Sequence, residues 1–500
     1  MSSQLIPALP AAKAAVESSA LDRSLLHGLA WTSAAKWTGQ LLSWASTLIV
    51  ARLLTPEDYG LVGMASVYLG LITLLSEFGL GTTVVTLRRL TDDQVAQLNG
   101  LAVLVGVCGF AVACAGAPYL GRFFHAPQLP AVVIAMSAAF VITSFKTVPF
   151  ALLQRELRFR SLALIETGRV LVLAVSMVGF AAFGFGYWTL VIGGALSSII
   201  STASVLALRR HPIAWPRPDS LRHAMTFSIH ILIGGLCWYI YSNADFLVAG
   251  RILGKTALGI YEVGWMLANV PVEKITALVT QVTPSVLSAV QADYAALRRY
   301  LLRLTEGLAL VAVPATLGIA LIASDFVPLA LGQKWQDAIV PLQLLALSAT
   351  LRTFTPVLPQ VLNAVGQSRA VMGYGILWAL VLPVSFWVFA SRWGVVGLAL
   401  AWVVVHPLLF YPAYRRVLAT IQVSNRAYLQ ALWPAFSASV AMAVSVLAVR
   451  WAAGQHWSLA TRFAAQVGAG ALAYTLTLLL LHRPRLVAFY SALQAARARS

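Results

Sequence analysis

Long apolar runs dominate the chain, and each has the length of a membrane span. Runs of roughly twenty apolar residues, enough to cross a bilayer core of about 30 Å, recur between short polar breaks. We count about fourteen of them. The predicted spans are 28–50, 60–81, 98–117, 130–150, 164–183, 187–207, 224–250, 258–284, 301–322, 338–364, 370–391, 394–418, 430–450 and 460–481.

The grouping of the runs predicts an all-α membrane protein with about 14 transmembrane helices in two six-helix bundles plus two C-terminal helices. The first 27 residues lack the basic start, apolar core and small-residue cleavage site of a signal peptide, so we expect an interfacial helix there. The predicted segments are a cytoplasmic N-terminal segment 1–27, a first bundle 28–207, a cytoplasmic linker 208–223, a second bundle 224–418, two additional helices 419–481 and a basic cytoplasmic tail 482–500.

Composition excludes a soluble fold. Of the 500 residues, 59% are hydrophobic and 10% are charged, with a mean hydropathy of +0.81. Soluble domains carry about 25% charged residues. The three cysteines lie inside apolar runs, where a free thiol behaves as a small hydrophobe, and we expect neither a disulfide nor a metal site.

The net charge of +18 has a topological explanation and does not require nucleic acid. With the N-terminus inside, the cytoplasmic segments hold more than half of the 35 Lys and Arg, and the opposite loops hold few. This asymmetry follows the positive-inside rule, so we predict a multi-pass inner-membrane protein with both termini cytoplasmic. The basic residues that we interpret as anchors near anionic lipid are Arg155, Arg158, Arg160, Arg209, Arg210, Arg217 and Arg222.

An internal repeat supports the two-bundle plan. The segment 48–62 aligns without a gap to 247–261, and each copy joins the first and second span of its bundle. Internal repeats are common in secondary transporters. The alignment pairs three identical residues: Arg52 with Arg251, Leu54 with Leu253 and Gly60 with Gly259.

Three motifs carry a resemblance to a known family: ARLLTPEDYGLVGMAS at 51–66, SEFGLGTTVV at 76–85 and DFLVAGRILGKTALGIYEVG at 245–264. The chain resembles the lipid-linked oligosaccharide flippases of bacterial polysaccharide synthesis, especially the branch with the colanic acid exporter, within the multidrug/oligosaccharidyl-lipid/polysaccharide exporters. The resemblance implies a non-enzymatic flippase that moves an undecaprenyl-pyrophosphate-linked sugar repeat unit to the periplasmic leaflet by alternating access. It also implies contact with a polysaccharide polymerase and a chain-length regulator.

Cations at membrane depth are the candidate substrate ligands. An ionisable residue facing lipid costs at least about 2.5 to 3.5 kcal/mol, so such residues should face the bundle interior. Lys36 and Arg352 lie deep in their spans, and we predict that they bind the pyrophosphate or acidic sugars; the alternative is pairing with a buried carboxylate. Lys146 has two open interpretations, substrate binding and snorkelling to the interface. Lys274 and Arg169 are the remaining candidate substrate ligands.

Buried carboxylates are the candidates for coupling to a proton or sodium gradient. Glu77, Asp245 and Glu273 are predicted for this role, with structural partnership to Lys36 or Arg352 as the alternative. Glu166 is three residues from Arg169 and shares its helix face, so a self-neutralising pair is favoured. Glu273 and Lys274 are adjacent and point about 100° apart, so at least one should line the cavity.

Other functions fit the sequence less well. The segment AGRILGKT at 249–256 lacks the first glycine of a P-loop and follows a membrane span, so we expect no nucleotide and no cofactor. A multidrug or cation antiporter of the same superfamily is the first alternative and would need an anionic pocket. A membrane-embedded polysaccharide polymerase or ligase is the second, but its large periplasmic loop is missing, since the break at 323–337 is the longest external one.

Overall fold

In the computed structural model the described residues are mostly helical and contain no strand. Within the same part of the chain, nine helices are long and apolar enough to cross a membrane. The prediction of an all-α, multi-pass membrane protein is therefore confirmed. The described residues are 39–40, 42–77, 80–86, 90–217, 235–236, 238–289, 293–454 and 456–485.

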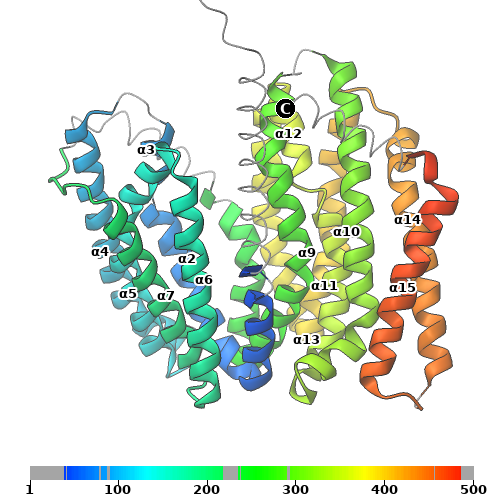
Figure 1. The fold of residues 1–500 in the computed structure, drawn as a ribbon, viewed down its shortest axis with the longest axis horizontal. Helices are drawn as coiled ribbons and strands as arrows, with labels where there is room; N and C mark the ends of the chain where they lie inside the picture. The colour runs from blue at the N-terminus through cyan, green and yellow to red at the C-terminus, as the bar shows by residue number, and fades with distance from the viewer. Residues whose placement is uncertain are drawn as a thin grey trace, which may run out of the picture. The chain divides into compact units, whose positions relative to one another are not determined.

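Residue contacts divide the chain into two compact units. The first unit includes 79–110 and 138–227, and its helices α6 and α7 lie side by side (Figure 1). Their sequences are apolar with few charges, which is why they form uninterrupted helices suited to lipid. The helices that contribute to this unit are α3 (Leu80–Thr86), part of α4 (Asp92–Phe123), part of α5 (Leu129–Arg155), α6 (Phe159–Ala182) and α7 (Trp188–Leu208).

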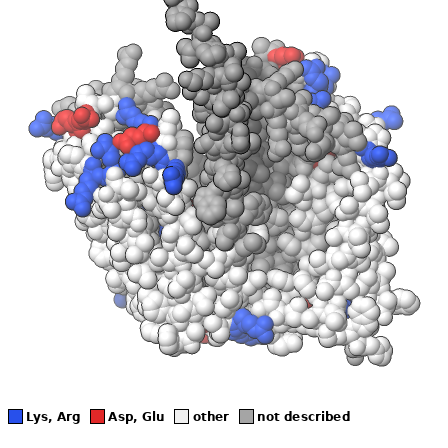
Figure 2. Space-filling view, in the orientation of Figure 1, with Lys and Arg blue, Asp and Glu red and all other residues white. Residues whose placement is uncertain are grey.

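A segment after α7 is fastened to the start of α4 within the first unit. The Asn99 side chain donates to the backbone oxygens of His211 and Pro212, each at 3.2 Å. Arg209 pairs with Glu156 at 2.9 Å. In the face shown in Figure 2, charged side chains gather mainly at helix ends, and the flanks along the helices are nearly free of them. This distribution is the one that a hydrocarbon environment requires.

The second unit contains α2 and all the helices after residue 253. One apolar core of this unit joins α10, α12, α13 and α14, and α14 and α15 pack side by side (Figure 1). Ser424 and Ser458 cap α14 and α15 by accepting from backbone N–H groups three residues on. The elements are α2 (Pro56–Glu77), η1 (Ala249–Leu253), α9 (Gly254–Ala289), α10 (Tyr294–Ala330), η2 (Gln333–Ala338), α11 (Ile339–Arg352), α12 (Val357–Ala364), α13 (Ser368–Thr420), α14 (Asn425–Ala453) and α15 (Leu459–Leu481).

Two helices in this unit are interrupted, one at a boundary between two predicted spans and the other inside a single predicted span. Gly394 has φ +59° inside α13, a conformation that favours glycine, and it separates the two spans expected at 370–391 and 394–418. The span expected at 338–364 is not continuous, because α11 ends at Arg352 and α12 begins at Val357. Pro356 lacks a backbone N–H and restricts the residue before it, which explains the break. Interrupted membrane helices often form transporter sites.

The helices that begin within the two repeat copies, α2 and α9, pack against each other inside the second unit. A Cβ added at Gly60 would lie 1.7 Å from the backbone oxygen of Lys255, and one added at Gly259 would lie 1.8 Å from that of Pro56. Lys255 is the repeat equivalent of Pro56, since both pairs are separated by the same 199 residues as Arg52 and Arg251. The contacts are therefore reciprocal, and only glycine permits them.

Candidate substrate site

The second unit holds an arginine between two tryptophans. The guanidinium carbon of Arg352, the last residue of α11, lies 4.1 Å from the ring centroid of Trp265 and 5.1 Å from that of Trp402. Trp265 comes from α9 and Trp402 from the second half of α13. The negative faces of both rings stabilise the cation, at about 0.5–2 kcal/mol each. Three elements distant in sequence therefore hold this side chain.

A buried carboxylate completes the cluster. The Tyr261 hydroxyl donates to Asp245 Oδ2 at 2.6 Å, and Trp402 Nε1 donates to the same oxygen at 2.9 Å. The backbone N–H of Phe246 donates to Oδ1 at 3.0 Å. Asp245 and Tyr261 are both 0% exposed. Asp245 interacts electrostatically with Arg352, but its oxygens bond to the tyrosine and the tryptophan.

Arg352 presents two buried donors on one edge. Its Nε and Nη2 atoms have no hydrogen-bond partner among the described residues. This is the edge that Arg169 uses on Glu166, with Nε donating to one carboxylate oxygen at 2.9 Å and Nη2 donating to the other at 2.6 Å. Two parallel N–H groups match the oxygens of a carboxylate or a phosphate. The arrangement suits planar, bidentate recognition of an anion.

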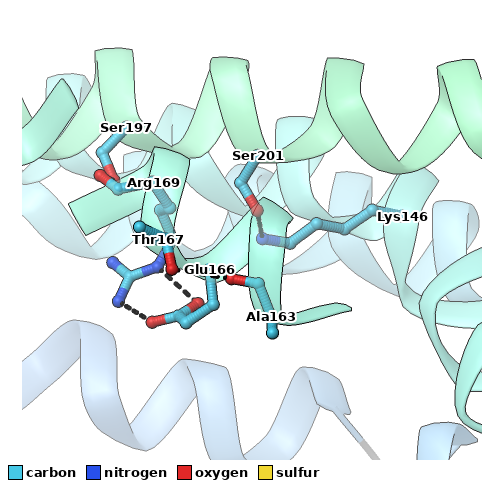
Figure 3. Close-up of polar contacts among 7 residues, drawn as sticks. All are labelled: Lys146, Ala163, Glu166, Thr167, Arg169, Ser197 and Ser201. Carbon is cyan, nitrogen blue, oxygen red and sulfur yellow. Dashed lines mark hydrogen bonds and ion pairs between the residues drawn. The ribbon is translucent and has the colours of Figure 1, made fainter. Parts of the chain in front are cut away.

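The first unit contains a second group of predicted residues (Figure 3). Lys146 of α5 donates to the Ser201 hydroxyl of α7 at 2.8 Å, so its ammonium is bonded between helices. Arg169 and Glu166 of α6 form the predicted ion pair, and both of the arginine's paired donors are used. The prediction of a self-neutralising pair is confirmed. Lys146 has electrostatic interactions with both members of this pair.

The remaining predicted residues have separate outcomes. Lys36 lies outside the described residues, as do the side chains of Glu77 and Lys274. Glu273 is described and exposed on α9. Of the predicted site residues, Arg352 and Asp245 are neighbours in the second unit, and Lys146, Glu166 and Arg169 are neighbours in the first. No group of three or more His, Cys, Asp or Glu suited to a metal occurs in the described part of the chain.

The sequence interpretation missed the aromatic members of the site. Trp265, Tyr261 and Trp402 were not predicted, because tryptophan in a membrane protein is most often an interfacial residue. A signal was present for two of them: Tyr261 belongs to the family motif at 245–264, and Trp265 follows it directly. His406, one turn after Trp402 on α13, lies 5.5 Å from that ring, centroid to centroid.

The helices define an all-α, multi-pass membrane protein. A family profile described as "Polysaccharide biosynthesis protein" matches residues 49–340, more than half of the chain. The chain therefore belongs to the polysaccharide biosynthesis protein family. The predicted resemblance is confirmed by this match and by the relatives below.

Two curated relatives span nearly the whole chain. The lipopolysaccharide biosynthesis protein WzxC of Escherichia coli (strain K12) is 24% identical over 424 residues, which cover 84% of this chain and 86% of the relative. The teichuronic acid biosynthesis protein TuaB of Bacillus subtilis (strain 168) is 23% identical over 463 residues, which cover 91% and 95%.

Solved structures share the fold. The lipid II flippase MurJ, in an inward closed conformation, matches with a TM-score of 0.71 at 11% identity, covering 91% of this chain and 99% of that one. An inward-facing multidrug transporter of the MATE family matches with a TM-score of 0.57 at 17% identity, covering 77% and 96%. Both likenesses concern architecture alone.

Proposed function

We propose that this protein is a flippase that moves undecaprenyl-pyrophosphate-linked oligosaccharide repeat units from the inner to the outer leaflet of the bacterial inner membrane. The polymer would be an exopolysaccharide, a capsule or an O-antigen. The proposal includes fourteen spans in two six-helix bundles plus two helices, with both termini cytoplasmic. It is supported by the family membership and by relatives whose names refer to lipopolysaccharide and teichuronic acid synthesis.

The observation that carries the proposal is the two-donor edge of Arg352. A pyrophosphate offers pairs of oxygens at the spacing of Nε and Nη2. The tryptophan rings hold the guanidinium plane, so little side-chain entropy is lost when an anion binds. We assign Arg352 to recognition of the pyrophosphate or of acidic sugars, and Asp245 to fixing Trp402 through its Nε1 hydrogen bond.

Lys146 is the second cation that we assign to the substrate path. The Lys146 ammonium donates to a neutral group, the Ser201 hydroxyl, and so makes no direct contact with a carboxylate. Arg169, in contrast, is neutralised by Glu166. Arg169 is therefore the weaker candidate of the two. Lys36 and Lys274 stay predictions as substrate ligands, and Glu77, Asp245 and Glu273 stay predictions as coupling groups. Contact with a polymerase and a chain-length regulator also belongs to the proposal.

The test is a deletion strain complemented with plasmid copies of the wild type, Arg352→Lys, Arg352→Gln and Arg415→Lys. Arg415 is a matched control because it also lies over an aromatic ring, that of Tyr411 at 5.9 Å, but is exposed. Accumulation of the lipid-linked repeat unit on the cytoplasmic side of the membrane is measured together with exported polymer and with the amount of each variant in the membrane.

We expect the wild type and Arg415→Lys to restore export and both Arg352 variants to fail at normal membrane levels. Normal polymer export without the gene would refute the flippase. Drug sensitivity of the same strains tests the cation antiporter alternative. That alternative is disfavoured because the buried Asp245 already accepts bonds from Tyr261 and Trp402.

A further inference from the structure

The α2·α9 crossing contains a carboxylate that the proposed substrate site does not use. Glu262 lies one turn after Gly259 on α9, and Gly63 lies one turn after Gly60 on α2. These two residues are 199 apart, so they are equivalent positions of the internal repeat. A Cβ built on Gly63 would lie 2.3 Å from Glu262 Oε2. The glutamate carboxyl therefore occupies the space that the missing side chain of Gly63 leaves.

Glu262 as a whole is partly buried, but one oxygen of its carboxyl, Oε2, is buried in this niche. Its Oε2 atom has no hydrogen-bond partner among the described residues, and on α2 the ionisable group that interacts with it is Tyr59. Charged and titratable groups on the other elements around α9 belong to other pairs or clusters. Lys255 pairs with Glu57, Arg251 contacts His125, Lys334 is attracted by Asp58, and Asp325 pairs with Arg462. Arg352 is attracted by Asp245, and His406 belongs to that same cluster.

Among the described residues, the niche supplies Oε2 with no hydrogen-bond donor. An ionised carboxylate taken from water without donors or cations is costly, whereas the neutral acid is tolerated. The niche formed by Gly63 is narrow, because Leu258 closes its side at 3.5 Å from the same built Cβ. Hydration of the buried oxygen Oε2 therefore requires that α2 and α9 separate.

We propose that Glu262 is a proton-binding group that locks the α2·α9 crossing when protonated and releases it when ionised. The O–H bond of the acid breaks as the crossing opens, the proton passes to water, and the carboxylate is hydrated. The inference rests on the proposed transport function in one respect, since it names a proton as the coupling ion. It adds a group that the sequence did not single out.

The crossing offers a reporter that needs no transported substrate. Met64, next to Gly63, is 1% exposed and lines a cavity of about 430 Å³ that also touches Gly250 and Leu253. In a chain whose three native cysteines are replaced by serine, Met64→Cys should be protected while the crossing is closed. Thr256→Cys, on the exposed first turn of α9, supplies the reference rate that corrects for thiol ionisation.

The experiment measures modification by a membrane-impermeant thiosulfonate for each single-cysteine chain in nanodiscs at pH 5.5 and pH 8.5. The quantity compared is the rate at residue 64 divided by the rate at residue 256. We expect this ratio to rise at least tenfold with pH when Glu262 is present. We expect it to stay at the low value at both pH values in Glu262→Gln and in Glu262→Ala, which both lack the titrating group.

Each outcome is decisive. A ratio that does not change with pH in the chain with Glu262, or one that rises equally in Glu262→Gln, overturns the proposal. The readout is separate from flipping. If the ratio responds as expected while the deletion strain exports polymer normally, the proton lock stands and the proposed substrate is wrong. If the ratio is flat while the deletion strain accumulates repeat units, the flippase stands and the lock is wrong.

Discussion

The paired glycines at the α2·α9 crossing provide the sharpest test of the fold. Gly60→Ala would place a methyl group 1.7 Å from the backbone oxygen of Lys255. Real Cβ contacts stay beyond 3.0 Å, so the helices would have to move apart by at least the difference, 1.3 Å. The atom that is struck belongs to the backbone and cannot rotate away. The reciprocal clash, between Gly259→Ala and Pro56, is of the same size at 1.8 Å.

The expected cost combines two terms of opposite sign. Overpacking of a tight contact costs about 1–3 kcal/mol. Alanine replaces glycine in a helix with a gain of about 1 kcal/mol. We therefore expect Gly60→Ala and Gly259→Ala to lower stability by up to about 2 kcal/mol. A matched control is Gly318→Ala in α10, where no heavy atom lies within 4 Å of the built Cβ, so only the favourable helix term applies.

The measurement is the apparent Tm of each purified variant in detergent. It is determined from the loss of monodisperse protein after heating. Gly60→Ala and Gly259→Ala should melt below the wild type, and Gly318→Ala should melt at or above it. The Met64→Cys reporter should also become more reactive in Gly60→Ala. Equal Tm values for Gly60→Ala and Gly318→Ala, with an unchanged reporter, would refute the close crossing.

Two further predictions concern the charges of the second unit. Arg352→Lys keeps the charge but loses the two-donor edge, so undecaprenyl pyrophosphate should bind at least tenfold more weakly, equivalent to about 1.4 kcal/mol, whereas Arg415→Lys should bind normally when both are titrated in nanodiscs. Arg462→Gln removes the partner of the 1% exposed Asp325 and should destabilise the protein by about 3–5 kcal/mol, seen as a lower Tm. Arg485→Gln breaks a more exposed pair and should cost at most about 1 kcal/mol.

Local sequence patterns correctly predicted the structural features that depend only on residues close together in the chain. The apolar runs located the helices, because a span needs only its own length and composition to be stable in lipid. Glu166 and Arg169 were predicted to pair because three residues of helix bring them together, and they do. The break at Gly394 falls where one predicted span ends at 391 and the next begins at 394, because Arg392 interrupts the apolar run there.

The site depends on contacts that no local pattern encodes. Trp265, Arg352 and Trp402 are separated by 50 or more residues at each step, and the helix break after Arg352 lies inside a single predicted span. Deep membrane position correctly marked Arg352 as a residue in need of partners. It did not show that two aromatic faces would supply the partners, or that a hydrogen-bonded Asp245 would hold one of those rings.

The symmetry of the repeat requires the same residue at one pair of equivalent positions and different residues at the next pair. Gly60 and Gly259 must both be glycine, because each faces the other copy's backbone. The next equivalent positions, which hold Gly63 and Glu262, cannot both hold the same residue. Two glutamates would contend for one niche, and two glycines would leave a void whose lining atoms lose their contacts. The side chain that fills the niche is ionisable, so the point where the two copies must differ is also the point where a proton can control their packing.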